Sequence, residues 1–502
     1  MDNVAFPVCS PAKSWIQRIF GMKRVRASAA GFILLWASPV SGQGPLTPPG
    51  APGPTMRTLD QIDAHIAAAA AEKRIDVLSL PGGSVLGNPT LHIIDASAGG
   101  SYYLSAGITV RVGGQFAIGV INTGSIVLDL NGQTIEGGAL GVHAIFTDDA
   151  VITVRNGSIR NFTGGGVIGN ARNTRVEDVT VTGSGTAFQL GAQSLLVRCL
   201  AKSNNQGYNC GLNCSFVQCT SEASATIGFF GDGGVFRDCI ATGNGDDGFE
   251  STGGTFVNCS ASNSHAAMHS GAGFDLGTGC TLTGCRANGN DTGVLFSGGC
   301  NFAACVAESN PYGGFVTHTT GGVSDGMGCV FTGCSARGNG SWEYNVGDAS
   351  SLAHCTALAV SGTAAIGIAA TVGCSITDCT VRGASIYGIV TGIRSSVRDC
   401  TVTGTVSFGG YGIVVGGDCV VSGCHSSQNA YGIYVSSGTG CRIEGNEVRD
   451  NTNTGISAGF ADAILRNGAG GNGTNYSPGS GVNFAPIQSL STMTNPAANI
   501  AF

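Results

Sequence analysis

The densest cluster of side chains able to do chemistry lies between Asn244 and Glu250, which reads Asn-Gly-Asp-Asp-Gly-Phe-Glu. It brings the carboxylates of Asp246, Asp247 and Glu250 into one short stretch. Several carboxylate oxygens from one short turn are the ligands that a hard cation prefers. Aspartate and asparagine in turns also commonly accept hydrogen bonds from nearby backbone N–H groups. The cluster is therefore either an ion or substrate site, or a set of solvated turn residues.

The cluster belongs to a repeat whose period predicts the fold. One position recurs every 20 to 29 residues and is usually cysteine, and the residue three places before it is apolar from Val176 onward. A Gly-apolar pair such as Gly248-Phe249 follows in most units. Each unit therefore indicates short strands with inward residues at period two, separated by Gly and Asn turns. The equivalent positions are Asn131, Asn156, Val179, Cys199, Cys219, Cys239, Cys259, Cys285, Cys305, Cys334, Cys355, Cys379, Cys400, Cys424 and Asn446.

One such unit cannot bury its apolar side alone, so it must stack on copies of itself. If every copy adds one strand to each of several parallel sheets, equivalent residues lie ~4.8 Å apart. The sequence thus predicts an all-β fold, a right-handed parallel β-helix, over residues 108–465. The 83 glycines and the charged fraction of 11% suit tight turns around a narrow core. We expect Phe216, Phe236 and Phe256 to stack ring over ring inside it.

Residues 1–42 have the features of a secretory signal. Five basic residues precede the apolar run Ala27 to Ala37, which is too short to span a bilayer, and small residues from Ser38 to Gly42 offer a cleavage site. We predict a secreted, periplasmic or cell-surface protein whose chain starts at Met1 or Met22 and keeps no transmembrane segment after cleavage. A buried apolar helix is the alternative.

The remaining segments flank the coils. Residues 43–57 are rich in Pro and Gly and predict an extended linker. Residues 58–107 predict a capping helix from Leu59 to Lys73, followed by capping strands. Residues 466–502 predict a tail that caps the last coil. Acidic residues outnumber basic ones, 31 against 24, and no basic tract follows the signal, so a nucleic-acid partner is not expected.

The cysteines need an explanation of their own, because 19 of the 20 follow the signal region. A zinc or redox site needs ligands that converge on one point, whereas these cysteines recur along a rod. We predict a ladder of buried, reduced thiols, because cysteine behaves as a small apolar residue with a weak donor. Disulfides between coils and metal binding are the alternatives. Cys210 and Cys214 form the best candidate for a disulfide.

Five segments resemble a group of secreted right-handed β-helix proteins from bacteria. The resemblance covers nearly the whole chain after the signal region and bears on fold rather than activity. The segments that carry it are Gly53 to Ile62, Gly100 to Leu104, Asp129 to Gly132, Gly473 to Tyr476 and Pro496 to Asn499.

More distantly, the coils resemble the β-helix superfamily of pectate lyases, polygalacturonases and polysaccharide epimerases. The acid cluster resembles the calcium-binding Asn-x-Asp-Asp-Gly-Phe-Asp segment of one class of β-helix pectate lyases, with Glu250 in place of the last aspartate. The resemblance implies Asp246, Asp247 and Glu250 as Ca²⁺ ligands, joined by Asp275 one coil further on. In such lyases calcium bridges the substrate uronate and acidifies its carbon-bound proton.

Residues near the cluster complete the candidate site. Asp232 lies one coil earlier, and the insertion from Asn263 to Gly271 adds His265 and His269, so these three side chains are candidates for substrate binding. Such lyases use lysine or arginine as the catalytic base, and Arg286 is the candidate here. The chain contains neither Gly-His-Gly nor Arg-Ile-Lys, so the polygalacturonase pattern is missing.

These observations support hypotheses from different classes. The first is an exported protein that interacts with polysaccharide, as a calcium-dependent polysaccharide lyase acting on acidic glycans. The second is a non-catalytic rod of the cell envelope or an adhesion module. The third is a periplasmic copper-associated β-helix protein. The acid cluster favours the first, the missing lysine base favours the second, and the inward positions of the cysteines argue against the third.

Overall fold

The computed structural model describes residues 74–265, 271–320, 323–360, 365–405, 409–489, 491 and 494–502. The predicted signal, linker and capping helix lie outside this part of the chain. Within it the regular elements are 57 β-strands with 3-10 turns that include η1 (Val77–Ser79) and η2 (Ala96–Ala98). No helix of the described residues is long and apolar enough to cross a membrane.

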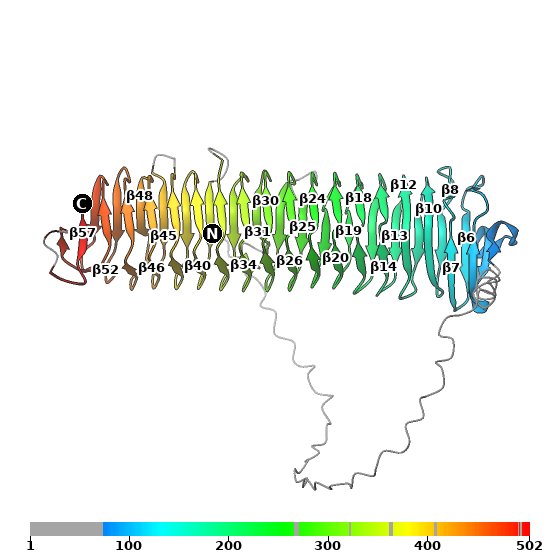
Figure 1. Cartoon of the computed structure of the whole chain (residues 1–502), viewed down its shortest axis with the longest axis horizontal. Helices are drawn as coiled ribbons and strands as arrows, with labels where there is room; N and C mark the ends of the chain where they lie inside the picture. Colours follow the sequence, from blue (N-terminus) through cyan, green and yellow to red (C-terminus); the bar gives the residue numbers. More distant parts are fainter. Residues whose placement is uncertain are drawn as a thin grey trace, which may run out of the picture. The chain divides into compact units, whose positions relative to one another are not determined.

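The described coils form one compact unit in which each coil stacks on the one before it (Figure 1). A typical coil contains β20 (Val235–Arg237), β21 (Ile240–Thr242) and β22 (Phe249–Ser251). The strand β20 pairs in parallel with β17 (Ser215–Val217) and β23 (Thr255–Val257). Equivalent residues are in register from coil to coil, which confirms the predicted parallel β-helix.

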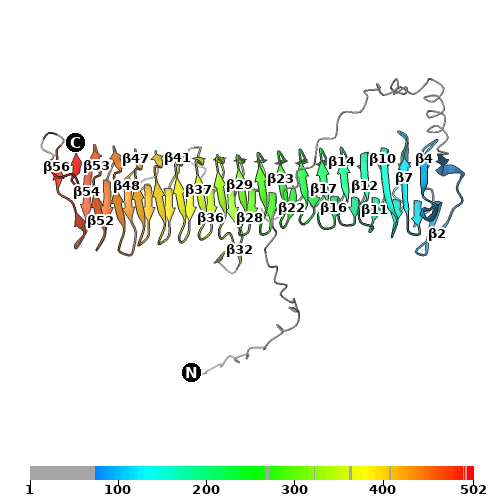
Figure 2. The same cartoon turned by 60° about the horizontal axis from the view of Figure 1, so that its bottom comes forward.

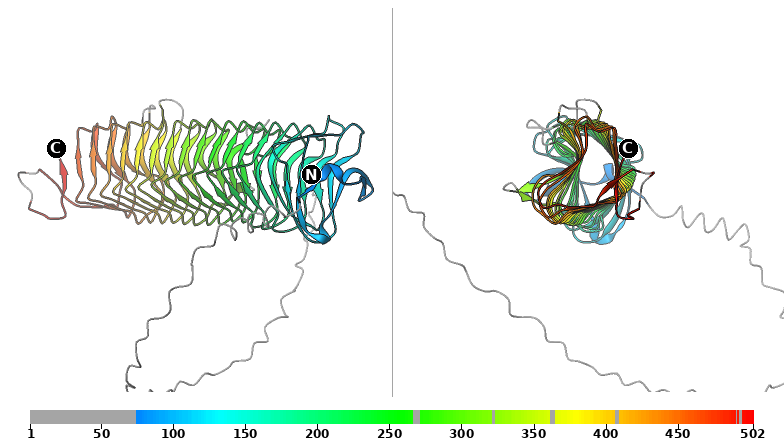
Figure 3. Two further views of the ribbon diagram at one scale, coloured as in Figure 1. Left: turned by 45° about the vertical axis from the view of Figure 1, so that its right-hand side comes forward. Right: turned by 90° about the vertical axis from the view of Figure 1, so that its left-hand side faces the viewer.

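Two sheets make up the walls of the coils, and Figure 3 shows their strands along the axis. The larger has 36 strands and includes β10 (Val151–Arg160), β12 (Arg175–Thr182), β14 (Leu195–Val197) and β15 (Leu200–Lys202). Because β12 pairs with both β14 and β15, this sheet continues as two ladders. The second sheet carries the candidate site and includes β13 (Thr186–Leu190), β16 (Gln206–Cys210), β19 (Phe229–Phe230), β22, β25 (Ala272–Leu276), β28 (Thr292–Phe296), β31 (Gly313–Thr317), β36 (Trp342–Val346), β39 (Ile366–Ala370), β42 (Tyr387–Thr391), β45 (Tyr411–Val415), β48 (Tyr431–Val435), β51 (Thr454–Ala458) and β54 (Thr474–Pro478).

The core is a column of stacked side chains. The ring of Phe236 lies 4.6 Å from that of Phe216 and 4.5 Å from that of Phe256, and the ring planes differ by 2° and 3°. All three residues are fully buried, as predicted. A second stack from the other sheet, which includes Phe229 and Phe249, meets this one edge to face. Offset and edge-to-face ring contacts are favourable beyond the apolar area that they bury.

The described cysteines are buried free thiols that occupy the stacked repeats. The thiol of Cys239 donates to the carbonyl of Phe216 in the preceding coil at 3.5 Å, and Cys259 donates to Phe236 at 3.4 Å. Cys210 and Cys214, the candidate disulfide, are also free thiols here. Burial raises the pKa of Cys239 far above its ordinary value, which disfavours the reactive thiolate.

Thiol labelling tests the reduced state. We expect a thiol reagent to modify the native protein slowly, because the thiols are buried. After denaturation without a reductant the reagent should modify most cysteines, because they are not joined in disulfides. The number of modified cysteines, measured by intact-protein mass spectrometry, gives the result. Labelling close to zero in the denatured, unreduced protein would instead mean that disulfides join the coils.

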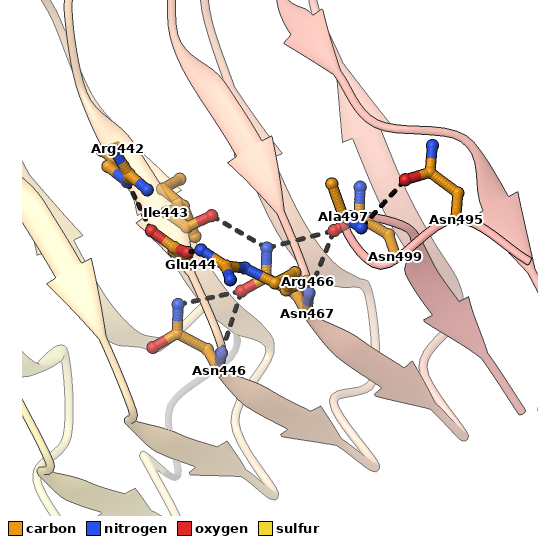
Figure 4. A network of polar contacts seen from close by, with 9 residues as sticks. All are labelled: Arg442, Ile443, Glu444, Asn446, Arg466, Asn467, Asn495, Ala497 and Asn499. Carbon is orange, nitrogen blue, oxygen red and sulfur yellow. Dashed lines mark hydrogen bonds and ion pairs between the residues drawn. The ribbon is translucent and has the colours of Figure 1, made fainter. Parts of the chain in front are cut away.

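Asparagine takes over the contacts between coils at the C-terminal end (Figure 4). The backbone N–H and the side-chain amide of Asn446 both donate to Oδ1 of Asn467, at 2.9 and 3.0 Å, and Asn467 repeats this contact with Asn499. Asn499 begins β57 (Asn499–Ala501), which pairs with β53 (Gly468–Gly470). The end of the chain therefore folds back onto the last coils.

Candidate functional site

The predicted acids lie in two adjacent strands of the second sheet and in the turn before one of them. Glu250 in β22 and Asp275 in β25 are register partners, and both point away from the core because the preceding Phe249 and Phe274 are fully buried. Asp246 and Asp247 lie in the turn before β22. Asp247 Oδ1 accepts a hydrogen bond of 2.7 Å from the backbone N–H of Ala272, one coil further on.

Burial and mutual repulsion raise the pKa values of Asp246, Asp247 and Glu250. Burial raises the pKa of Asp247 to about 8, and the charges of Asp275, Asp246 and Glu250 add to the increase. The hydrogen bond from Ala272 opposes the shift without reversing it. The pKa of Glu250 is also raised, first by burial and then by Asp275. Asp247 is therefore protonated at neutral pH, since a proton removes the cost of burying a charge.

The partner of Asp275 is His318, which sequence reasoning missed. Its Nε2 lies 2.8 Å from Asp275 Oδ1, and this hydrogen bond raises the pKa of His318 against the effect of burial. The hydrogen bond thus favours the imidazolium form of His318. His318 follows β31 in the longest coil, where β32 (Thr319–Thr320) and β33 (Val323–Ser324) pair as a hairpin. Figure 2 shows β32 projecting from the stacked coils. The sequence feature that could have pointed to this histidine is the long step from Cys305 to Cys334, which marks a coil with extra residues.

A pocket of about 800 Å³ lies beside this pair on the outer face of β28, β31 and β36. Tyr312 and Trp342 form an aromatic wall, with ring centroids 5.4 Å apart in an edge-to-face arrangement. His265, predicted for substrate binding, lies 2.9 Å from Asp291 Oδ1 at the pocket. The lining residues are Asp291, Thr292, Leu295, Pro311, Tyr312, Val316, Thr317, His318, Thr319, Trp342 and Asn345.

The other predicted site residues lie elsewhere or act indirectly. Asp232 accepts a hydrogen bond from the backbone N–H of Thr252 at 2.8 Å, and its charge adds to the raised pKa of Glu250. Arg286 begins β27 (Arg286–Asn288) in the larger sheet and forms an ion pair of 2.6 Å with Glu308. The structure thus places Arg286 on a different sheet from the acids. His269 lies outside the described residues.

The comparisons with known proteins bear on this fold. Residues 364–482 match the family model described as "Right handed beta helix region". This match to the C-terminal coils confirms the predicted right-handed β-helix. A search of curated proteins found no match.

Solved structures with a similar arrangement include several β-helix proteins. The Azotobacter vinelandii mannuronan C-5 epimerase AlgE6 A-module is 14% identical, with 81% of this chain and 90% of that chain covered and a TM-score of 0.25. Pectate lyase Pel9A is 13% identical, with coverages of 62% and 68% and a TM-score of 0.22. The catalytic domain of a GH87 alpha-1,3-glucanase is 13% identical, with coverages of 77% and 64% and a TM-score of 0.24. With sequence identities and TM-scores this low, no activity of these proteins can be assigned to this chain.

The carboxylates of this right-handed β-helix do not form the implied calcium site as they stand. Asp247 Oδ1 is directed at the N–H of Ala272, and Asp275 Oδ1 at the ring of His318. In the described part of the chain, no three His, Cys, Asp or Glu side chains gather closely enough to hold a metal ion. A hard cation needs several oxygen ligands aimed at one point, so this donor set does not fit calcium. The thiols, spread along the coils, likewise do not converge on copper.

What the β-helix does bring together is a pair of carboxyl groups in different environments. Glu250 has a raised pKa, whereas its register partner Asp275 receives a hydrogen bond from His318. Two neighbouring carboxyls in different environments can act as an acid and a base in the same reaction. The adjacent pocket offers the flat aromatic rings of Tyr312 and Trp342 to a ligand.

Proposed function

We propose that the protein binds a polysaccharide across the outer face of the second sheet and cleaves it by acid–base catalysis. The observation that carries this proposal is the pair Glu250 and Asp275, held by His318 next to a pocket with an aromatic wall. A largely apolar pocket with a few polar groups and shifted pKa values is typical of an enzyme site.

The two carboxyls have distinct roles in the proposed hydrolysis. Glu250, whose pKa is raised by burial, is the proposed acid and donates its proton to the glycosidic oxygen as the bond from that oxygen to the sugar carbon breaks. Asp275 takes a proton from the water whose oxygen bonds to the same carbon. His318 is a positioning residue, since its hydrogen bond orients Asp275.

The charge of the site favours a neutral glycan. Among the pocket-lining residues only His318 can carry a positive charge. A polyanion would find little positive charge to pair with there unless a cation bridged it to the protein. Export through residues 1–42, which we also propose, would bring the site into contact with extracellular glycans.

Substitution of the two carboxyls tests the catalytic roles. We expect Glu250→Gln and Asp275→Asn each to lower the release of reducing ends from neutral polysaccharides by about 10²–10⁴-fold, the usual range for removing a general acid or base. Glu308→Gln is the matched control, because Glu308 pairs with Arg286 on the larger sheet, and its activity should equal that of the wild type. Equal activity of all four proteins would contradict the assigned roles.

The same assay separates the alternatives. Product that forms only from acidic glycans, only with added calcium, and with the absorbance of an unsaturated uronate would favour the calcium-dependent lyase and overturn the hydrolase. Binding without product from any glycan would favour the non-catalytic rod. With neutral glycans we expect chelation by EDTA to leave activity unchanged, since no step proposed for Glu250 or Asp275 requires a metal ion.

A further inference from the structure

A second feature of the same sheet lies toward its C-terminal end, beyond the pocket. Tyr387, Tyr411 and Tyr431 are register partners in three successive strands, with ring centroids 5.6 and 4.7 Å apart. Tyr434 lies 5.2 Å from Tyr411 in the neighbouring row. The four rings are only half-buried, whereas the isoleucines two places after the first three are buried in the core. These four tyrosines, here the tyrosine track, therefore line the outside of the coils.

The tyrosine track continues the wall of the pocket. Strand pairing places Trp342 opposite Ile366, Ile366 opposite Tyr387, and so on to Tyr431. Trp342 lines the pocket, so one row of side chains runs from the pocket to the tyrosines. At ~4.8 Å per coil, Tyr431 lies ~19 Å from Trp342 along the axis.

The chemistry of this surface differs from that of the acid cluster. The neighbouring row carries Ala369, Val390 and Val414 where the N-terminal coils carry Glu250 and Asp275. Both rows are uncharged from Trp342 to Tyr434. Tyrosine combines an apolar ring with a hydroxyl that both donates and accepts hydrogen bonds. Such a surface fits a partner that is uncharged, has flat apolar faces and carries many hydroxyls.

We infer that the tyrosine track binds sugar rings of a neutral polysaccharide that extends from the pocket toward the C-terminal end of the coils. This inference rests on the proposed function, because the pocket supplies the first contact with the chain. The regular spacing of the tyrosines suits a polymer of repeating units better than a compact ligand. Long chains should therefore bind more tightly than short oligosaccharides that fill the pocket alone.

The experiment compares glucan oligosaccharides of increasing length. The whole chain contains three tryptophans, and two of them lie in the proposed signal 1–42, so Trp15→Phe and Trp36→Phe in protein that keeps this segment leave Trp342 as the single fluorescent reporter of the pocket. In this background we expect Tyr411→Ala to weaken the binding of long oligosaccharides roughly tenfold, as the loss of one stacked ring does. The binding of short oligosaccharides, read from Trp342, should not change.

Two further variants make the result specific. Tyr411→Phe keeps the ring and should retain most of the affinity for long chains. Phe460→Ala removes an exposed aromatic ring from the turn after β51 and should behave as wild type. Melting temperatures show whether each variant is folded, and Tyr431→Ala replaces Tyr411→Ala should the latter unfold.

The possible outcomes separate this inference from the proposed function. Equal affinity of wild type and Tyr411→Ala for long chains would overturn the tyrosine track but not the pocket, provided that short oligosaccharides still bind. A dimer that Tyr411→Ala converts to monomer, with glycan affinity unchanged, would assign the tyrosines to a second copy of the chain and overturn the inference. If neither short nor long glycans bind the wild type, the proposed function fails and the inference fails with it.

Discussion

Replacing Phe236 by Ala is expected to lower the free energy of unfolding by ~3–5 kcal/mol. The ring is fully buried between Phe216 and Phe256 at 4.6 and 4.5 Å and meets two further rings edge to face. The coils above and below are fixed ~4.8 Å apart by their backbone hydrogen bonds, so they cannot close in to fill the space. The cavity left by the ring should therefore persist, and the loss in free energy of unfolding should lie near the top of this range.

Denaturant unfolding followed by circular dichroism measures this loss. Phe460→Ala is the matched control, because it removes the same ring from an exposed position, and its effect should stay within about 0.5 kcal/mol. A loss for Phe236→Ala no larger than that of the control would show that the phenylalanine stack does not support the fold.

The second large effect concerns Asp247, which should make the protein less stable as pH rises. Its pKa is about 8 in the folded chain and 3.8 in the reference state. Below pH 4 both states carry the proton and the residue has no effect on stability. Between pH 4 and 8 the folded state holds the proton and the unfolded state does not, so stability falls by about 1.4 kcal/mol per pH unit.

Asp247→Asn removes this dependence because an amide stays neutral while its oxygen can still accept from the N–H of Ala272. We expect the variant to match the wild type near pH 4 and to exceed its free energy of unfolding by up to ~5 kcal/mol at pH 8. Unfolding curves at several pH values give the difference. Asp238→Asn changes an exposed carboxyl, so the difference in free energy of unfolding between this variant and the wild type should not change with pH. The same pH-independent result for Asp247→Asn would contradict a buried, protonated carboxyl at Asp247.

The repeat made the fold predictable from the sequence. Each coil contacts chiefly the coils before and after it, so the spacing of Phe216, Phe236 and Phe256 in the chain translates directly into their stacking. The alternation of inward and outward residues likewise predicted that Cys239 is buried. The acids Glu250 and Asp275 could be aligned for the same reason, because both follow a Gly-Phe pair.

The positions of residues outside the repeat were decided only by the tertiary structure. His318 belongs to a coil of unusual length, so no spacing in the chain relates it to Asp275, and only the path of its loop brings them to 2.8 Å. Arg286 follows the acids closely in sequence, but the intervening turn carries it to another sheet. The repeat pattern also does not predict where the polar end of each side chain points. The sequence alone determined which residue types gather around Asp247. Only the tertiary structure decided where the carboxyl oxygens point, because Asp247 is fixed by a hydrogen bond from the N–H of Ala272 and Asp275 by one from the ring of His318, and both partners belong to other coils.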